Sequence, residues 1–342
     1  MTAGGAIAVR EFSFEEPDLP DVWARLLAAS PVRPITQTFA FQRLWRETYE
    51  VEQPLLLLAE RDGVPVAIAP LFAAGGMVFF LGVGEADYHD IIGAGHDPDV
   101  VTALVQAAAD RTEDFEGFKL HFFPEESATP AALDEAARRL GLDLHEMGDI
   151  VTVVVDMASD PQAVRRAVGG SMNKREGWFR QRGGILVQPL TTAAEVLPLL
   201  PEFFAMHVAR WESKGIESTY LGPEVRTFLE RWVEVSAAHG WLRALRLEWE
   251  GRTLAMEFSW DYESRQYCGQ WAFPLADARR SPGQVLLRHS VLQALDRGVT
   301  IYDQGLGDQD YKFHLPNRTV TCTTWGLFPR DAEASLPPHP VG

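Results

Sequence analysis

A short run of residues in the C-terminal half combines positive charge with a predicted helix start. The run consists of Arg279, Arg280, Ser281, Pro282, Gly283 and Gln284. Serine favours the N-cap and proline the first helical position, so we predict that a helix begins here. Free amides and the helix dipole attract a phosphate, arginines add charge-assisted bonds, and glycine permits close approach. The run therefore predicts a phosphate-binding site, although a well-capped surface helix with two solvated arginines would explain the same residues.

Further polar motifs lie on both sides of this run. After a predicted strand, an Asp-x-Gly-x-Gly-x-x-x-Tyr-Lys motif is formed by Asp303, Gly305, Gly307, Tyr311 and Lys312. Upstream, His207, Arg210 and Trp211 are spaced three and four residues apart, which places them on one face of a predicted helix. Residues 171–175, Ser-Met-Asn-Lys-Arg, open another helix that is rich in arginine.

Together these segments resemble the CelD/BcsL-type branch of the GNAT acetyltransferases. The GNAT acyl-CoA loop follows the pattern Arg/Gln-x-x-Gly-x-Gly/Ala, which Arg280 and Gly283 match, whereas Val285 departs from its final small residue. The segments occur in the family's order across residues 171–328, while the N-terminal half matches only in overall pattern. The resemblance implies an α/β fold of two tandem GNAT-like domains with mixed sheets, packed together as in the related FemABX proteins. It also implies acetyl-CoA or another acyl-CoA as co-substrate.

The resemblance further implies that an amine attacks a thioester directly, with a base for the ammonium and an acid for the thiolate. Tyr311 is then the candidate acid, and Lys312 a candidate for binding an oxyanion or a negative group of the acceptor. Asp303 could orient that lysine or deprotonate the amine. Structural interpretations stay open for each of them: an aromatic anchor, a solvated lysine and a turn-capping aspartate.

One glycine inside a predicted strand has two possible explanations. Gly269 lies within the strand 266–273, where an interior glycine often marks a bulge or a close backbone approach. A bulge would point a backbone amide at the acyl oxygen while the pantetheine pairs as an extra strand. Alternatively, Gly269 is a small residue beneath an aromatic ring.

The acceptor is expected to meet residues from both halves of the chain. His207 is a candidate base beside Arg210 and Trp211, although a hydrogen-bonded core histidine is an equal alternative. In the first half, Tyr88 and Asp90 follow a glycine-rich apolar strand and are candidate acceptor contacts across a cleft between the domains. Polar loops after strands are common, so this pattern is weak.

These side chains must be positioned by alternating helices and strands. Apolar periodicity and helix start signals predict helices at 19–29, 39–49, 97–111, 130–140, 160–168, 171–182, 193–212, 223–239 and 282–297. Strand patterns predict a hairpin at 54–72, strands at 77–83, 118–123 and 150–155, a strand-rich run at 241–273, and strands at 299–303 and 320–328.

An internal match indicates that one α/β unit occurs twice. Residues 60–67 and 248–255 share Glu, Gly and Ala at an offset of 188, and each copy is a strand, a tight turn and a strand. Each is followed by a further strand, a helix that starts with proline and another strand. We expect domains at 1–158 and 159–330 and a disordered tail at 331–342. Only the second is expected to bind CoA, because Asp97-Pro98-Asp99 would repel a pyrophosphate.

Composition narrows the functional class. The chain has 342 residues, 23% of them charged, and a net charge of −17 without a basic block, which disfavours nucleic acid as a partner. It has no apolar run of 18 residues and no visible signal peptide, and its two cysteines, Cys268 and Cys322, lack metal-site spacing. We therefore expect a cytoplasmic protein without a metal.

The favoured hypothesis is an acyl-CoA-dependent N-acyltransferase that acts on a small-molecule amine. By family resemblance, the acceptor would be an amino sugar or a precursor of an exopolysaccharide or envelope component. Two alternatives remain open: a FemABX-like aminoacyltransferase that uses aminoacyl-tRNA, which the net charge disfavours, and a non-catalytic module that keeps the fold and binds CoA or another ligand.

Overall fold

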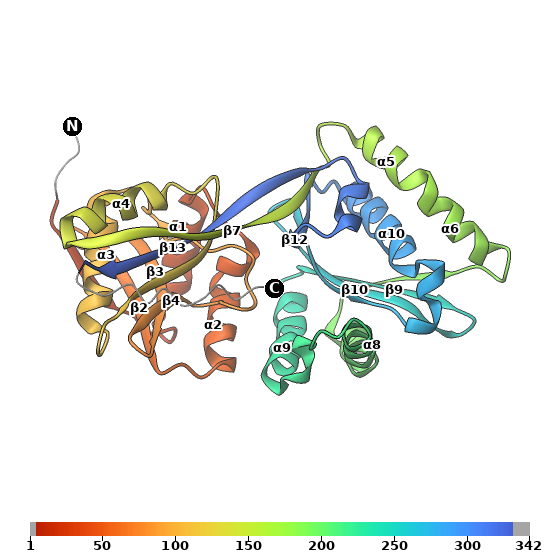
Figure 1. The fold of residues 1–342 in the computed structure, drawn as a ribbon, viewed down its shortest axis with the longest axis horizontal. Coiled ribbons are helices and arrows are strands. Elements are labelled where there is room, and N and C mark those ends of the chain that lie inside the picture. Colours follow the sequence, from red (N-terminus) through yellow and green to blue (C-terminus); the bar gives the residue numbers. More distant parts are fainter. Residues whose placement is uncertain (1–4, 331–342) are drawn as a thin grey trace. The chain divides into compact units, whose positions relative to one another are not determined.

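The computed structural model describes residues 5–330, which divide into two compact units (Figure 1). The first extends to Ile150 and takes up the chain again at Thr321, and the second is Val151–Val320. The predicted disordered tail, 331–342, lies outside the described residues.

The first unit is a mixed sheet covered by helices. Its strand order is β1-β2-β3-β4-β6-β13-β7, with β5 paired to β3. The helices α3 and α4 pack together, and α3 also packs against β1 and β2. The strands are β1 (Ile7–Glu11), β2 (Gln53–Arg61), β3 (Val64–Ala74), β4 (Met77–Phe80), β5 (Ile92–Gly93), β6 (Gly117–Pro124), β7 (Leu142–Asp156) and β13 (Arg318–Pro329), and the helices are α1 (Leu19–Ala29), α2 (Phe39–Thr48), α3 (Pro98–Arg111) and α4 (Thr129–Leu140).

The second unit has helices on both faces of its sheet (Figure 1). Its strand order is β7-β12-β11-β10-β9-β8, in which β7 is shared with the first unit. The helices α8 and α9 pack on one face, and α5, α6 and α10 on the other. The strands are β8 (Leu186–Leu190), β9 (Leu242–Trp249), β10 (Arg252–Tyr262), β11 (Arg265–Ala272) and β12 (Ile301–Leu306), and the helices are α5 (Pro161–Gly169), α6 (Ser171–Arg180), α7 (Ala193–Val196), α8 (Leu200–Glu212), α9 (Pro223–Ala238) and α10 (Pro282–Arg297).

The two units repeat the same order of elements, as the internal sequence match predicts. The hairpin β2–β3 turns at Asp62 and Gly63, with φ of 51° and 78°, and the hairpin β9–β10 turns at Glu250 and Gly251, with φ of 52° and 75°. Positive φ at both central residues suits the right-handed twist of a hairpin. A third strand, a helix that begins with proline and a parallel partner strand follow in each unit: β4, α3 and β6, and then β11, α10 and β12.

Most predicted elements are confirmed, and the differences have local causes. The single helix predicted at 193–212 is wrong, because the chain forms α7, a 3-10 turn at Leu197–Leu199 and then α8. Pro198 and Pro201 lie at this break, where their missing N–H groups remove helical hydrogen bonds. The edge strands β1 and β8 were not predicted, and β7 extends further toward the N-terminus than the predicted strand.

Two further properties concern the described residues. Across residues 5–330, none of the helices has both the length and the apolar character needed to cross a membrane. Neither Cys268 nor Cys322 forms a disulfide bond within residues 5–330.

Candidate functional site

The parallel strands β11 and β12 pair over a short distance only. Their register joins Arg265 to Ile301, Gln266 to Tyr302 and Tyr267 to Asp303, and it ends there. Beyond this point, β12 shifts register against β7 between Asp303 and Leu306. The sheet therefore has a gap in its pairing between the ends of these two strands.

A β-bulge lies on β11 at the start of this gap. Glu257 pairs with Trp271 and Ser259 with Cys268, so two residues, Gly269 and Gln270, lie opposite Phe258 alone. The bulge predicted at Gly269 is thus confirmed. The second explanation holds as well, because a Cβ atom at Gly269 would come within 2.2 Å of the Trp260 ring.

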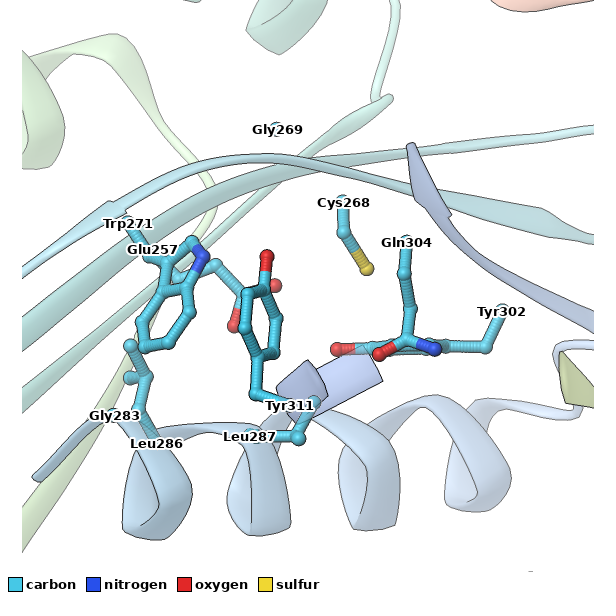
Figure 2. A pocket seen from close by; sticks show the side chains of 10 residues that line it. All are labelled: Glu257, Cys268, Gly269, Trp271, Gly283, Leu286, Leu287, Tyr302, Gln304 and Tyr311. Carbon is cyan, nitrogen blue, oxygen red and sulfur yellow. The ribbon is translucent and has the colours of Figure 1, made fainter. Parts of the chain in front are cut away.

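A cavity of about 40 Å³ opens between this part of the sheet and α10. Figure 2 shows the sheet above the cavity and α10 below it, and the labelled side chains line the cavity. The volume exceeds the roughly 10–15 Å³ that one water molecule needs, so a small group fits here. The lining residues are Glu257, Cys268, Gly269, Trp271, Gly283, Leu286, Leu287, Tyr302, Gln304 and Tyr311.

Glu257 is a buried carboxyl group in this cavity that the sequence analysis missed. It is 5% exposed and accepts a hydrogen bond from Ser290 Oγ at 3.0 Å. Burial raises its pKa to about 7, against the lowering effects of the Ser290 hydrogen bond and of Arg297. A carboxyl group with a pKa near neutrality can accept and release a proton under ordinary conditions. The available signal was a lone acidic residue among the apolar residues of a buried strand.

Tyr311 faces the same cavity. Its ring meets Trp271 edge to face at 4.9 Å between ring centroids. Burial raises the pKa of the Tyr311 hydroxyl, so it keeps its proton at neutral pH. The structure thus brings the predicted acid together with a carboxyl group that can act as a base (Figure 2).

Gln304 supplies an unused hydrogen-bond acceptor to the cavity. Its Nε2 donates to the Lys312 carbonyl at 2.9 Å, and among the described residues its Oε1 has no hydrogen-bond partner. A buried acceptor without a donor is costly unless a bound molecule pairs with it. The atom therefore fits a ligand that carries an N–H group, as the amides of a pantetheine arm do.

The start of α10 is less open than predicted. Pro282 and Gly283 are buried, and a Cβ atom at Gly283 would come within 2.0 Å of the Trp271 ring, so this ring already covers the glycine. The predicted side-chain cap is also wrong: Ser281 has φ of +53° and makes no capping bond, and its Oγ accepts from Arg175 Nη1 at 2.8 Å. Close approach of a ligand at Gly283 would require Trp271 to move.

Positive charge still gathers beside this helix start. Arg175 on α6 reaches Ser281 Oγ, and Arg279 and Arg280 are exposed on the 3-10 turn at Leu275–Arg280. Arg280 lies over the Trp178 ring at 4.5 Å and 3.5 Å from Asp277, which Arg252 holds at 2.6 Å. Gln284 is half-buried in the first turn of α10. The arginines make this end of α10 suitable for an anion.

Asp303 and Lys312 hold the glycine turn that follows β12. Lys312 is 2% exposed, and its Nζ donates to the carbonyls of Gly305 at 2.9 Å, Leu306 at 2.5 Å and Gly307 at 3.1 Å. Asp303 Oδ1 accepts from the Gly305 amide at 2.9 Å. These bonds engage the three protons of the ammonium group, so we assign Lys312 and Asp303 to support of the turn rather than to oxyanion binding or proton transfer.

His207, Arg210 and Trp211 lie on α8, on the other face of the sheet from α10. Trp211 Nε1 donates to His207 Nε2 at 2.9 Å, and His207 Nδ1 bonds to Ser218 Oγ at 2.9 Å. Burial lowers the pKa of His207 to about 4, so it is the hydrogen-bonded core histidine of the second interpretation. The Arg210 guanidinium lies 4.8 Å from the ring centroid of Trp271 and thereby packs against a cavity residue.

The two candidate residues of the first unit are buried. Tyr88 is 3% exposed, and Asp90, at 2%, accepts hydrogen bonds from the Thr129 hydroxyl and the Ile91 amide. Burial raises the pKa of Asp90 to about 6. These contacts give Asp90 a structural role within its own unit.

The start of α3 differs from that of α10. Asp97 caps α3 as predicted, accepting from the Asp99 amide at 2.9 Å, and pairs with Arg61 at 2.6 Å. Within residues 5–330, no group of at least three His, Cys, Asp or Glu side chains gathers closely enough to hold a metal ion.

Comparison with known proteins gives the family of the second unit. Residues 165–313 match the family model described as an acetyltransferase (GNAT) domain. The second unit contains a GNAT domain. The matched segment includes β9 to β12, α10, Glu257 and Tyr311. A comparison of the chain with curated proteins finds no match.

Solved structures resemble this protein over most of the chain. FemX has a TM-score of 0.61 at 11% identity, over 92% of this chain and 96% of its own. L-PGS from Bacillus licheniformis has 0.56 at 11%, over 94% of each chain. A tandem GNAT protein from the clavulanic acid biosynthesis pathway has 0.54 at 10%, over 94% and 98%. At these identities the likeness shows the fold alone, and the predicted class, α/β with two tandem GNAT-like domains, is confirmed.

Proposed function

We propose that this protein is an N-acyltransferase that moves an acetyl or other small acyl group from acyl-CoA to an amine. The observation that carries the proposal is the cavity beside the β11 bulge, where a carboxyl group of raised pKa and a protonated tyrosine face the same space. Thioester aminolysis needs such a pair, because one proton leaves the amine and another must reach the thiolate.

Each residue of the site has its own role in the proposed reaction. Gln304 Oε1 accepts a hydrogen bond from the acyl donor, and Arg175, Arg279 and Arg280 attract its phosphates at the end of α10. The amine nitrogen bonds to the acyl carbon as the carbon–sulfur bond breaks. Glu257 takes the proton from nitrogen, and Tyr311 gives one to sulfur. The half-buried Tyr311 regains its proton from solvent before the next turnover, which balances the proton that Glu257 gives up. Backbone amides of the Gly269 bulge are suited to polarise the acyl oxygen.

The acceptor belongs to the class of amino sugars or envelope and exopolysaccharide precursors, by the resemblance of the motifs. We expect it to bind in the second unit, beside the cavity that Glu257 lines. An acyl donor carried on tRNA is the competing possibility, and the net charge of −17 disfavours it.

Turnover tests the proposal. The protein is incubated with acetyl-CoA and a panel of amines that includes glucosamine, and release of the free CoA thiol is followed. We expect amine-dependent thiol release that falls at least about 100-fold in Glu257→Gln, while Glu250→Gln, in the exposed β9–β10 turn, stays at the rate of the unchanged protein. Binding of acetyl-CoA without transfer to any amine would favour a non-catalytic module, and transfer from aminoacyl-tRNA alone would overturn the choice of donor.

A further inference from the structure

A second, larger groove lies beside α10 in the same unit. It measures about 670 Å³, and it is lined in part by Arg243, Ser259, Gln266, Ser290 and Arg297. Ser259, Gln266 and Ser290 are at most 5% exposed, so the groove ends on buried polar side chains. Neither the acyl donor nor the acceptor occupies this groove in the proposed reaction.

Ser290 joins the groove to the cavity. It lines the groove, and its Oγ donates to Glu257 Oε1 at 3.0 Å on the cavity side. It also accepts from Tyr302 Oη at 2.9 Å and from Gln266 Nε2 at 3.2 Å. One hydroxyl group therefore contacts both the candidate base and the residues at the end of the groove.

The remaining hydrogen bonds give this network a fixed direction. Arg297 Nη2 donates to Gln266 Oε1 at 2.7 Å, which leaves the Gln266 amide nitrogen to donate to Ser259 Oγ at 3.0 Å and to Ser290. Arg297 in turn pairs with Asp261 at 2.8 Å. Each donor in the chain from Arg297 to Ser290 points toward Glu257, so the network stabilises the carboxylate form.

We propose that Ser290 passes protons between the Glu257 carboxyl group and water in this groove. The role rests on the proposed transfer reaction, in which Glu257 gains one proton in each turnover and must lose it before the next. With the acyl donor and acceptor bound at the cavity, a route on the groove side lets Glu257 reset without product leaving first.

The step conserves atoms and charge. The O–H bond of protonated Glu257 breaks as its proton bonds to Ser290 Oγ, and the original Ser290 proton passes to a water molecule in the groove. Glu257 becomes a carboxylate and the water becomes hydronium, with no oxidation or reduction. The Gln266 bond is the longest of the three at Ser290, so it is the contact that this water displaces.

Other titratable and charged groups face Glu257 without offering the same route. Cys268 on β11 is half-buried and Tyr302 on β12 is buried, and desolvation raises the pKa of both well above their ordinary values, so they hold their protons. Tyr311 faces the cavity rather than the groove, and Arg297 acts on Glu257 through its charge and through the hydrogen bonds of Gln266 and Ser290.

Time-resolved infrared spectroscopy of the whole protein tests the relay without any acyl donor. The carboxyl band of Glu257 is identified by its loss in Glu257→Gln. A light-released proton then lowers the pH from above to below the pKa of about 7, and the rise of the band is timed. In Ser290→Ala we expect the rise to slow about tenfold or more, because the hydroxyl that carries the proton is gone.

Two variants separate the relay from a structural effect. Ser259→Ala removes a neighbouring hydroxyl that bonds to Gln266 but not to Glu257, and it should leave the rate within about twofold. Ser290→Thr keeps a hydroxyl and should restore most of the rate. An unchanged rate in Ser290→Ala, or equal slowing in Ser259→Ala, would overturn the relay. The outcome is independent of acyl-CoA turnover, so the relay and the transfer function can fail separately.

Discussion

Glu257 and Tyr311 have environments that suit opposite roles in proton transfer. Burial raises the pKa of both, which brings the carboxyl group to about 7 and keeps the phenol protonated. A group that titrates near neutrality serves as a base, and one that holds its proton serves as an acid. Tyr311 could be found from a sequence motif. Glu257 could not, because its raised pKa depends on the residues that surround it after folding.

The buried carboxyl group of Glu257 should change how the free energy of unfolding depends on pH. Between pH 4.5, the ordinary pKa of a glutamate, and about 7, folded Glu257 keeps a proton that the unfolded chain has lost. The folded state then binds more protons, so its free energy of unfolding falls as pH rises through this window. We expect Glu257→Gln to remove this fall, worth of the order of 3 kcal/mol at most.

Denaturant unfolding at several pH values measures this difference. Relative to the unchanged protein, Glu257→Gln should gain stability as pH rises from 4.5 to about 7 and no more above it. Glu250→Gln in the exposed turn serves as control and should show no such trend. A difference that does not vary with pH would mean that Glu257 is not held protonated by burial.

Tyr311→Phe tests the assigned acid. Without the hydroxyl, no group at this position can protonate the departing thiolate, so we expect turnover with acetyl-CoA to slow by roughly 100-fold. The affinity for CoA should stay the same, because the ring and its contact with Trp271 remain. Tyr267→Phe, on β11 outside the cavity, is the matched control, and equal turnover in both variants would place the acid elsewhere.

At the scale of elements, the junction of β11 and α10 controls access to the cavity. Trp271 ends the bulged segment of β11 and covers Gly283 at the start of α10. The helix start was predicted from Ser281 and Pro282, and α10 does begin at Pro282. The ring that fills the space above Gly283 could not be predicted. Its position follows from the bulge, which shifts the register of every later residue of β11 against β10.

Gly283→Ala should disturb this junction. A Cβ atom would come within 2.0 Å of the Trp271 ring, so the ring must move, at a cost of about 1–3 kcal/mol. We expect a lower melting temperature and a changed tryptophan emission. Gly177→Ala, in α6, meets no atom within 4 Å and should be neutral or slightly stabilising. If Gly283→Ala matches this control, Trp271 does not pack on Gly283 in solution.

The predictability of the elements follows their local signals. Helices with proline starts and hairpins with glycine turns were placed well, since those signals are local. The motifs of His207 and Lys312 were found in the sequence, but the roles of the two residues were not. His207 accepts a hydrogen bond from Trp211, and Lys312 donates to the carbonyls of the Gly305–Gly307 turn, so both have structural roles. Such partners come from packing, which spacing in the sequence does not encode.

At the scale of the whole molecule, the two units share one order of elements but differ at their helix starts. In the first unit, Asp97 and Asp99 place carboxylates at the start of α3, whereas Arg175 and Arg280 lie at the start of α10. An anionic donor is therefore expected in the second unit only. On the proposed function, the same order of elements occurs twice, whereas the acyl-donor site occurs once, in the second unit.

Calorimetric titration with acetyl-CoA tests this central claim most directly. We predict one site per chain, with a dissociation constant of roughly 1 μM to 1 mM, weakened about tenfold or more in an Arg175→Gln, Arg280→Gln double variant. Arg46→Gln, in the first unit, should bind as the unchanged protein does. The absence of binding heat, or equal affinity in the double variant, would contradict the account.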